Sequence, residues 1–208
     1  MRHHSMITIV DYGLGNIRAF LNVFHRLNIV ARTASSAAEL EGASKVILPG
    51  VGAFDDAMER LGRSGMRPAL DDLALRQRVP ILGVCVGMQM LGHGSDEGRL
   101  PGLGWIDGRV KDLSARGSLN LPVPHMGWND VRPVATSRLF DQLDSGARFY
   151  FLHSYYFVCD RDEDRLAVAT YGEDFACAAR AGNILGVQFH PEKSHHYGAR
   201  LLQNFAEM

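Results

Sequence analysis

Residues 80–89 read Pro-Ile-Leu-Gly-Val-Cys-Val-Gly-Met-Gln, an apolar run that leads into a cysteine between two glycines. The apolar run predicts a buried strand, and a helix is expected from about Gly87. Cys85 therefore lies on a turn that joins a strand to a helix. This is the layout of the G-x-S-x-G nucleophile elbow with cysteine in place of serine, and the N–H groups at a helix N-terminus favour a reactive thiolate. The alternative interpretation is a cysteine packed as a small apolar side chain.

The same alternation of strand and helix extends back to the N-terminus. Apolar residues Ile17, Phe20, Phe24 and Leu27 recur at helical spacing after a glycine-rich turn. Strands that alternate with helices predict a parallel sheet with right-handed crossovers. The expected strands are Met6–Val10, Ile29–Arg32, Lys45–Leu48 and Pro80–Val84, and the expected helices are 17–27, 53–62 and 67–77.

The second half of the chain has a different pattern. Between about residues 102 and 185, short alternating segments are separated by turn residues, which predicts mixed or antiparallel strands added to the parallel core. We therefore expect one α/β domain over residues 6–208, with a mainly parallel twisted sheet flanked by helices. Residues 1–5 are interpreted as an N-terminal extension or tag remnant. The expected segments are strands at 105–110, 148–152, 155–159, 166–170 and 184–189, and a helix at 195–207.

Composition narrows the class of protein. The chain has 208 residues, 46% hydrophobic and 22% charged, with a formal net charge of −1. Those values are typical of a globular domain and disfavour disorder or nucleic-acid binding. No apolar run reaches the length of a membrane span, and the three cysteines include no C-x-x-C pair. We expect no metal, no cofactor, no nucleic acid and no membrane partner, and the sparse free thiols favour a cytoplasmic location.

A cysteine nucleophile needs a histidine base that is oriented by an acceptor. The segment His190-Pro191-Glu192 offers both at the end of a predicted strand. In extended backbone, residues two apart point to the same side, so Glu192 could orient the imidazole of His190. Taken alone, the pattern also fits a strand-ending histidine beside a solvated carboxylate. Together with the elbow, the order Cys85, His190, Glu192 predicts a catalytic triad.

The loop Pro49-Gly50-Val51-Gly52 follows the third predicted strand. A glycine-flanked turn there could aim a backbone N–H at a developing oxyanion, together with the N–H of Val86. The alternatives are a simple strand-to-helix turn or a phosphate cradle. The phosphate interpretation is weak because no G-x-x-x-x-G-K-[ST] motif is present.

Three motifs in this order and spacing resemble the class I, or triad, glutamine amidotransferases, which implies a flavodoxin-like α/β fold. Three further segments are similar to the glutaminase subunits of imidazole glycerol phosphate synthases within that family. The resemblance covers about residues 6 to 207. The motifs are 83–89, 49–52 and 190–192, and the further segments are 11–16, 124–129 and 149–155.

The resemblance implies the role of each site residue. Cys85 would attack the side-chain amide of glutamine, with His190 as base and acid and Glu192 as its orienter. The N–H groups of Val51 and Val86 would form the oxyanion hole. Ammonia would pass to a (β/α)8-barrel cyclase subunit that makes imidazole glycerol phosphate and aminoimidazole carboxamide ribonucleotide for histidine biosynthesis. The positions that match glutamine-binding residues are Gly50, Gln89, Glu97, Ser154 and Tyr155.

The resemblance also implies a surface for the cyclase. Tryptophan and methionine are enriched in interface cores, although Trp128 and Met126 could equally pack into the core of this chain. Lys193 directly follows the triad carboxylate and is a candidate sensor of docking. The matching interface positions are Asn16, His125, Met126, Trp128, Asn129, Tyr150 and Lys193.

Other functions remain open at the level of sequence. The triad could belong to the glutaminase subunit of another amidotransferase or to a cysteine peptidase of similar fold. A non-catalytic flavodoxin-like binding module would share the fold alone. Gln89 and the segment 125–129 favour the glutaminase subunit of an imidazole glycerol phosphate synthase, because a peptidase needs neither of them.

Overall fold

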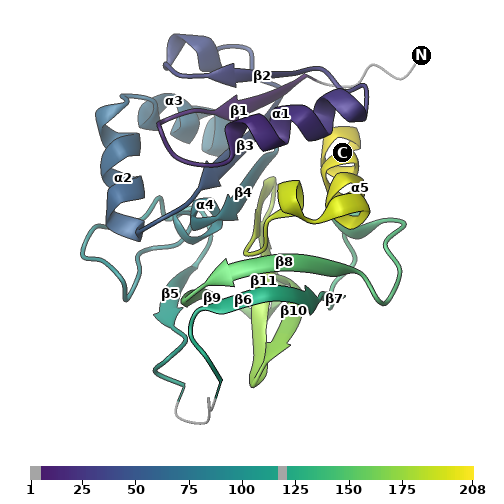
Figure 1. The fold of residues 1–208 in the computed structure, drawn as a ribbon. Coiled ribbons are helices and arrows are strands. Elements are labelled where there is room, and N and C mark those ends of the chain that lie inside the picture. The colour runs from purple at the N-terminus through teal and green to yellow at the C-terminus, as the bar shows by residue number, and fades with distance from the viewer. Residues whose placement is uncertain (1–5, 117–120) are drawn as a thin grey trace.

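The computed structural model describes residues 6–116 and 121–208. The five residues interpreted as an extension or tag remnant lie outside the described residues. A 10-stranded sheet runs through the molecule, and one half of it is parallel (Figure 1). The parallel strands, in spatial order, are β2 (Ala31–Ala34), β1 (Ile7–Val10), β3 (Lys45–Gly50), β4 (Ile81–Cys85) and β12 (Ile184–Val187).

The other half of the sheet is antiparallel, as predicted for the second half of the chain. It extends from β12 through β11 (Glu173–Ala181), β10 (Arg165–Tyr171) and β7 (Arg132–Pro133). Strands β9 (Tyr155–Cys159) and β5 (Gly108–Asp112) branch from β11. A separate two-stranded sheet pairs β6 (His125–Asp130) with β8 (Arg148–His153), so the fold is the expected α/β class with mixed strands added.

Helices cover the parallel strands. In Figure 1, α1 lies in front of these strands and beside α5, which is at the right of the view, and α2 and α3 lie at the left. Their apolar residues recur every three or four positions and face the core, as in α1, where Phe20, Val23 and Phe24 are buried. The helices are α1 (Ile17–Arg26), α2 (Phe54–Arg63), α3 (Arg67–Asp71), a π-helical turn (Asp72–Arg76), α4 (Val86–Gln89) and α5 (His195–Glu207), with 3-10 turns at Ala38–Leu40, Arg138–Phe140, Asp162–Asp164 and Pro191–Lys193.

The structure differs from the sequence-based elements in two instructive places. Strand β11 was not predicted, because its alanine-rich segment 176–181 has no strand propensity; it is a strand because small side chains pack between β10 and β12. The helix after the cysteine is only four residues long. Three residues after it ends, a Cβ at Gly92 would lie 2.7 Å from the ring of Phe157, so a glycine is needed where the chain passes β9.

Within the described residues, no helix is long and apolar enough to cross a membrane.

Candidate active site

The cysteine elbow is a strained turn that close glycine contacts make possible. Cys85 has φ +56° and ψ −115°, a backbone conformation that costs energy for a residue with a side chain. A Cβ on Gly87 would clash with the carbonyl oxygen of Leu48, and a Cβ on Gly50 would clash with the backbone N of Gly87. The two glycines therefore let β3 and the elbow approach closely, which places Gly50 beside Cys85 in the β3–β4 register.

His190 and Glu192 form a buried pair beside this elbow. The Nδ1 atom of His190 lies 2.9 Å from Oε1 of Glu192, and the two side chains are 4% and 1% exposed. Asn16 donates to the same carboxylate oxygen over 2.7 Å. Burial lowers the pKa of His190, but hydrogen bonds with Cys85 and Glu192 outweigh burial and raise this pKa to about 10. The three residues of the predicted triad therefore lie together: His190 is bonded to Glu192, and His190 and Cys85 line the same cavity.

The backbone around His190 is held by the smaller sheet. The N–H of His190 donates to the carbonyl of Tyr150 over 2.9 Å. The hydroxyl of Ser194 donates to the carbonyl of His190 over 2.6 Å and accepts from the N–H of Tyr150 over 3.0 Å. Strand β8 therefore crosses the end of β12 and fixes the position of the imidazole.

A cavity of about 460 Å³ opens over the cysteine at the carboxyl ends of the parallel strands, the edge at which open α/β sheets bind ligands. Of the predicted site residues, Gly50 and Glu192 are buried beside this cavity and are not part of its wall. The predicted residues that line it are Asn16, Val51, Cys85, Val86, Gln89, Glu97, Ser154, Tyr155, His190 and Lys193.

The two polar side chains predicted to hold glutamine are anchored to the fold. Gln89 is 3% exposed, and its Nε2 donates to the carbonyl of Tyr155 over 3.1 Å. An oxygen of Glu97 accepts from the N–H of Phe54 over 2.9 Å, at the first residue of α2. The positive end of that helix favours a carboxylate at this position. Glu97 is therefore a positioned charge on the cavity wall and not a freely solvated loop residue.

The loop 49–52, which carries the predicted oxyanion donor, is held by a hydrogen bond from a buried tyrosine. The hydroxyl of Tyr12 donates to the carbonyl of Pro49 over 2.7 Å. Val51 and Gly52 line the cavity, and Gly52 has φ +85°. A left-handed conformation of this kind favours glycine, so Gly52 allows a turn after Val51 that most other residues could not adopt.

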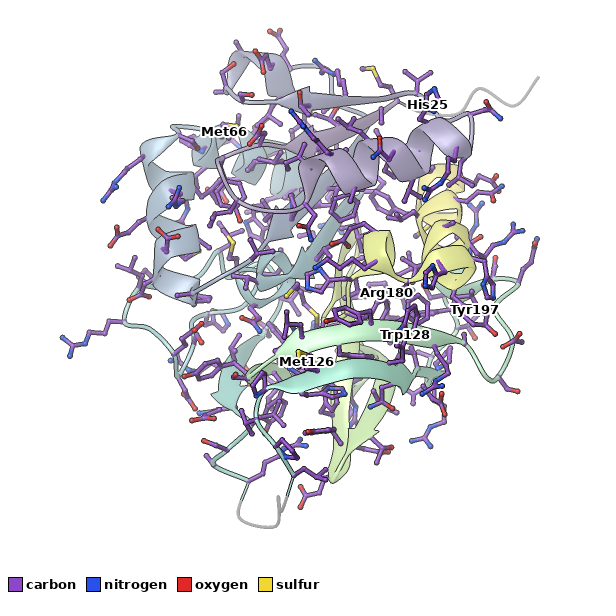
Figure 2. The ribbon with its side chains drawn as sticks, in the orientation of Figure 1. His25, Met66, Met126, Trp128, Arg180 and Tyr197 are labelled. Atoms are coloured by element: carbon purple, nitrogen blue, oxygen red, sulfur yellow. The ribbon has the colours of Figure 1, made fainter. Side chains whose placement is uncertain are left out.

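The exposed face of β6 and β8 carries part of the predicted partner surface. Met126 is 65% exposed and Trp128 is 40% exposed, and Figure 2 labels both on the smaller sheet. The indole of Trp128 stacks on the imidazole of His195 with ring centroids 5.1 Å apart. Lys193 is exposed and its ammonium lies 5.7 Å from the ring centroid of Tyr150. An exposed apolar group of this kind is typical of an interaction surface.

His125 does not belong to this exposed face. It is 3% exposed and stacks between Phe151 and Tyr171, at centroid distances of 4.8 and 4.1 Å. Asn129 is half-buried on the same side and donates to the carbonyl of Thr170 over 2.8 Å. His125 and Asn129 were predicted to contact the partner together with Met126 and Trp128. Because their segment is a strand, alternate side chains point to opposite faces, and His125 and Asn129 point inward.

Three residues near the cysteine escaped the sequence analysis. Gln188 is fully buried, and its Nε2 lies 3.9 Å from the sulfur of Cys85. His153 lines the cavity, and burial lowers its pKa to about 3. Tyr12 supports the loop at 49–52 through its hydroxyl. Only Gln188 had a usable signal, because it lies two residues before His190 along an extended segment and therefore shares its side.

Within residues 6–116 and 121–208, no group of three or more histidine, cysteine or carboxylate side chains could hold a metal ion.

The chain belongs to the class-I glutamine amidotransferase family, whose model matches residues 8–208. Imidazole glycerol phosphate synthase subunit HisH of Bdellovibrio bacteriovorus is 57% identical over 98% of this chain and 100% of its own length. The protein of that name from Leptospira borgpetersenii is 50% identical over the same shares. Among solved structures, PurLQS from Thermotoga maritima has a TM-score of 0.74 at 16% identity, covering 97% of each chain, which supports the fold.

Proposed function

We propose that this chain is the glutaminase subunit of an imidazole glycerol phosphate synthase. It hydrolyses glutamine to glutamate and ammonia, and the ammonia passes to a (β/α)8-barrel cyclase subunit in histidine biosynthesis. The observation that carries the proposal is the buried His190–Glu192 pair, whose imidazole lines the same cavity as the cysteine of the strained elbow. Full-length relatives with 50% and 57% identity, both named as the HisH subunit, support the choice of synthase.

In the first half of the reaction, the Cys85 sulfur, whose proton has been transferred to His190, attacks the amide carbon of glutamine. The carbonyl oxygen becomes an oxyanion that the N–H groups of Val51 and Val86 stabilise. The tetrahedral intermediate then breaks its C–N bond. His190 returns its proton to the nitrogen, ammonia leaves, and a glutamyl thioester remains on Cys85.

In the second half, water replaces ammonia. His190 removes a proton from the water as the water oxygen attacks the thioester carbon, and the C–S bond breaks. Glutamate leaves, and the proton on His190 restores the Cys85 thiol. Glu192 keeps Nδ1 of His190 protonated and favours the charged ring, so that the other ring nitrogen gives and regains the proton in both halves of the reaction.

Selection of glutamine rests on groups at the cavity wall. The carboxylate of Glu97 suits the α-ammonium group of an amino acid, because opposite charges attract strongly at a partly enclosed site. The backbones of Ser154 and Tyr155 line the same cavity and offer polar groups for the remainder of the substrate. Gly50 contributes by its lack of a side chain, since a Cβ there would clash with the elbow.

The cyclase is expected to dock on the exposed face of β6 and β8 around Met126 and Trp128. Lys193 and Asn16 line the cavity mouth and connect this face to the triad, since Asn16 is bonded to Glu192. We infer that this chain and the cyclase form a heterodimer. We also infer a cytoplasmic location, because three free cysteines fit a reducing compartment.

The proposal is tested with the complex of this chain and the cyclase. Cys85→Ala should abolish glutamine-dependent synthesis and leave synthesis from added ammonium salts, because Cys85 acts on glutamine alone. Both rates are measured by formation of imidazole glycerol phosphate. Equal loss of the ammonium-dependent rate would contradict this division of labour, and failure to bind the cyclase would favour another triad amidotransferase.

A further inference from the structure

Besides His190, the cysteine sulfur has two polar neighbours at 3.9 Å, the carbonyl of Leu152, which can only accept, and the side-chain amide of Gln188. Gln188 follows β12 directly, and its side chain is fully buried. Its Nε2 lies 3.9 Å from the sulfur of Cys85. Strand β12 runs parallel to β4, and Val187 is opposite Val84. The residues that follow them, Gln188 and Cys85, therefore lie next to each other at the elbow. The position of Gln188 is therefore set by the sheet register.

A chain of hydrogen bonds determines which end of the Gln188 amide faces the sulfur. The carbonyl of Tyr155 can only accept, so Gln89 must turn its Nε2 toward it, at 3.1 Å. The same Nε2 donates to Oε1 of Gln188 over 3.1 Å. With its oxygen held by Gln89, Gln188 presents its N–H group to Cys85.

The carbonyl that starts this chain is itself fixed. His153 Nδ1 lies 2.8 Å from the Tyr155 carbonyl and therefore donates to it, which leaves Nε2 of His153 as an acceptor. Nδ1 of His125 lies 2.9 Å from that acceptor. Burial lowers the pKa of His125 to about 4 and of His153 to about 3, so both rings are neutral near pH 7. Each hydrogen bond from His125 to Cys85 therefore has one donor and one acceptor.

We propose that Gln188 is a further catalytic residue, whose amide N–H donates to the Cys85 sulfur and stabilises the thiolate. With the thiol proton on His190, the sulfur carries negative charge in a residue that is only 4% exposed, and a buried charge needs a donor. A contact of 3.9 Å is long for a neutral thiol, but hydrogen bonds to charged acceptors are shorter and stronger. The same N–H would help the thiolate leave when the thioester is hydrolysed.

This proposal rests on the proposed function, because it assumes that Cys85 is the nucleophile. The test uses the full chain without substrate and follows alkylation of each cysteine by iodoacetamide against pH, resolved by mass spectrometry. Gln188→Met removes the donor and keeps the length of the side chain. Its expected effect is a higher pH midpoint for Cys85 and a rate near pH 7 that is lower by about tenfold or more, as for loss of a hydrogen bond to a charge.

Controls separate this effect from a structural one. Gln203→Met removes a glutamine whose Nε2 bonds Glu207 on α5 and should leave the Cys85 profile unchanged. Cys177 is buried and should remain unreactive in all variants. The charges that interact with Cys85 come from His190 and Tyr12, and Glu97, His153 and Lys193 line the same cavity. None of these is altered.

A second measurement needs no variant at Gln188. With 15N-labelled glutamine side chains, the amide resonance of Gln188 should move with pH at the midpoint of Cys85 and lose this response in Cys85→Ala. An unchanged alkylation midpoint in Gln188→Met, or an amide resonance that ignores Cys85, overturns the proposal for Gln188 alone. If Cys85 reacts no faster than Cys159 in the unaltered chain, the proposed function itself fails.

Discussion

Replacing Glu192 by glutamine tests the electrostatics of the site most directly. One carboxylate oxygen accepts from His190 over 2.9 Å and from Asn16 over 2.7 Å. Among the described residues, the other oxygen, Oε2, is buried without a hydrogen-bond partner. Glu192→Gln keeps an acceptor for His190 and removes the charge. It also places an N–H₂ group where no acceptor lies.

The size of the effect follows from the pKa of His190, which is raised from 6.5 to about 10. A hydrogen bond to a charged group is worth about 1.5–3 kcal/mol, which corresponds to roughly 1–2 pKa units. The substitution should therefore lower the pKa of His190 by about that amount. Because His190 has a higher pKa in the folded chain than in the unfolded chain, its protonation stabilises the fold fully below about pH 6.5 and ceases to do so as pH rises through 10.

Urea unfolding of the original chain and of Glu192→Gln at pH 6, 8 and 10 measures this dependence. The buried N–H₂ group should lower the unfolding free energy of Glu192→Gln by about 1–3 kcal/mol at every pH. In addition to this constant loss, the difference from the original chain should be largest near pH 6 and should narrow toward pH 10. Glu59→Gln, on an exposed i,i+4 pair with Arg63, is the control and should change stability by about 0.5 kcal/mol or less. A difference that stays constant from pH 6 to pH 10 would refute this account of His190.

Two further predictions concern the partner. Trp128→Ala should weaken association with the cyclase by more than about 1 kcal/mol, as expected for an interface anchor, and should leave the circular dichroism spectrum of the free chain unchanged because Trp128 is 40% exposed; an unfolded variant would mean that Trp128 is a core residue. We expect the Val51 peptide, which is flanked by Gly50 and Gly52, to point its N–H away from the oxyanion until the cyclase docks. The free chain should then hydrolyse glutamine about 100- to 1000-fold more slowly than the complex with cyclase ligand bound, because one missing oxyanion donor costs that much. Steady-state glutaminase assays measure both rates, and equal rates would refute this switch at Val51 without affecting the triad assignment.

Some features of the site could be predicted from the sequence because their causes are local. The elbow at Cys85 depends on glycines within two residues of it, and a Cβ on Gly83 would lie 2.7 Å from the Gly87 carbonyl oxygen. The pairing of His190 with Glu192 was predicted from a two-residue spacing in extended backbone; the contact is equally local, but it forms across the start of the 3-10 turn Pro191–Lys193. Strands β1, β3, β4 and β12 were visible as short apolar runs, since a strand covered on both faces is apolar throughout, whereas the edge strand β2 is half-buried and not such a run.

Contacts between distant segments could not be predicted in this way. The parallel register of β4 and β12 joins residues about a hundred positions apart, and that register alone places Gln188 beside Cys85. Which face of β6 is exposed depends on its pairing with β8, so the inward position of His125 required the tertiary structure. Glu97 gained its anchor from the start of α2, 43 positions earlier in the chain. Periodicity and spacing report the neighbours of a residue along the chain, whereas burial and partners across the sheet are decided only when the whole core packs.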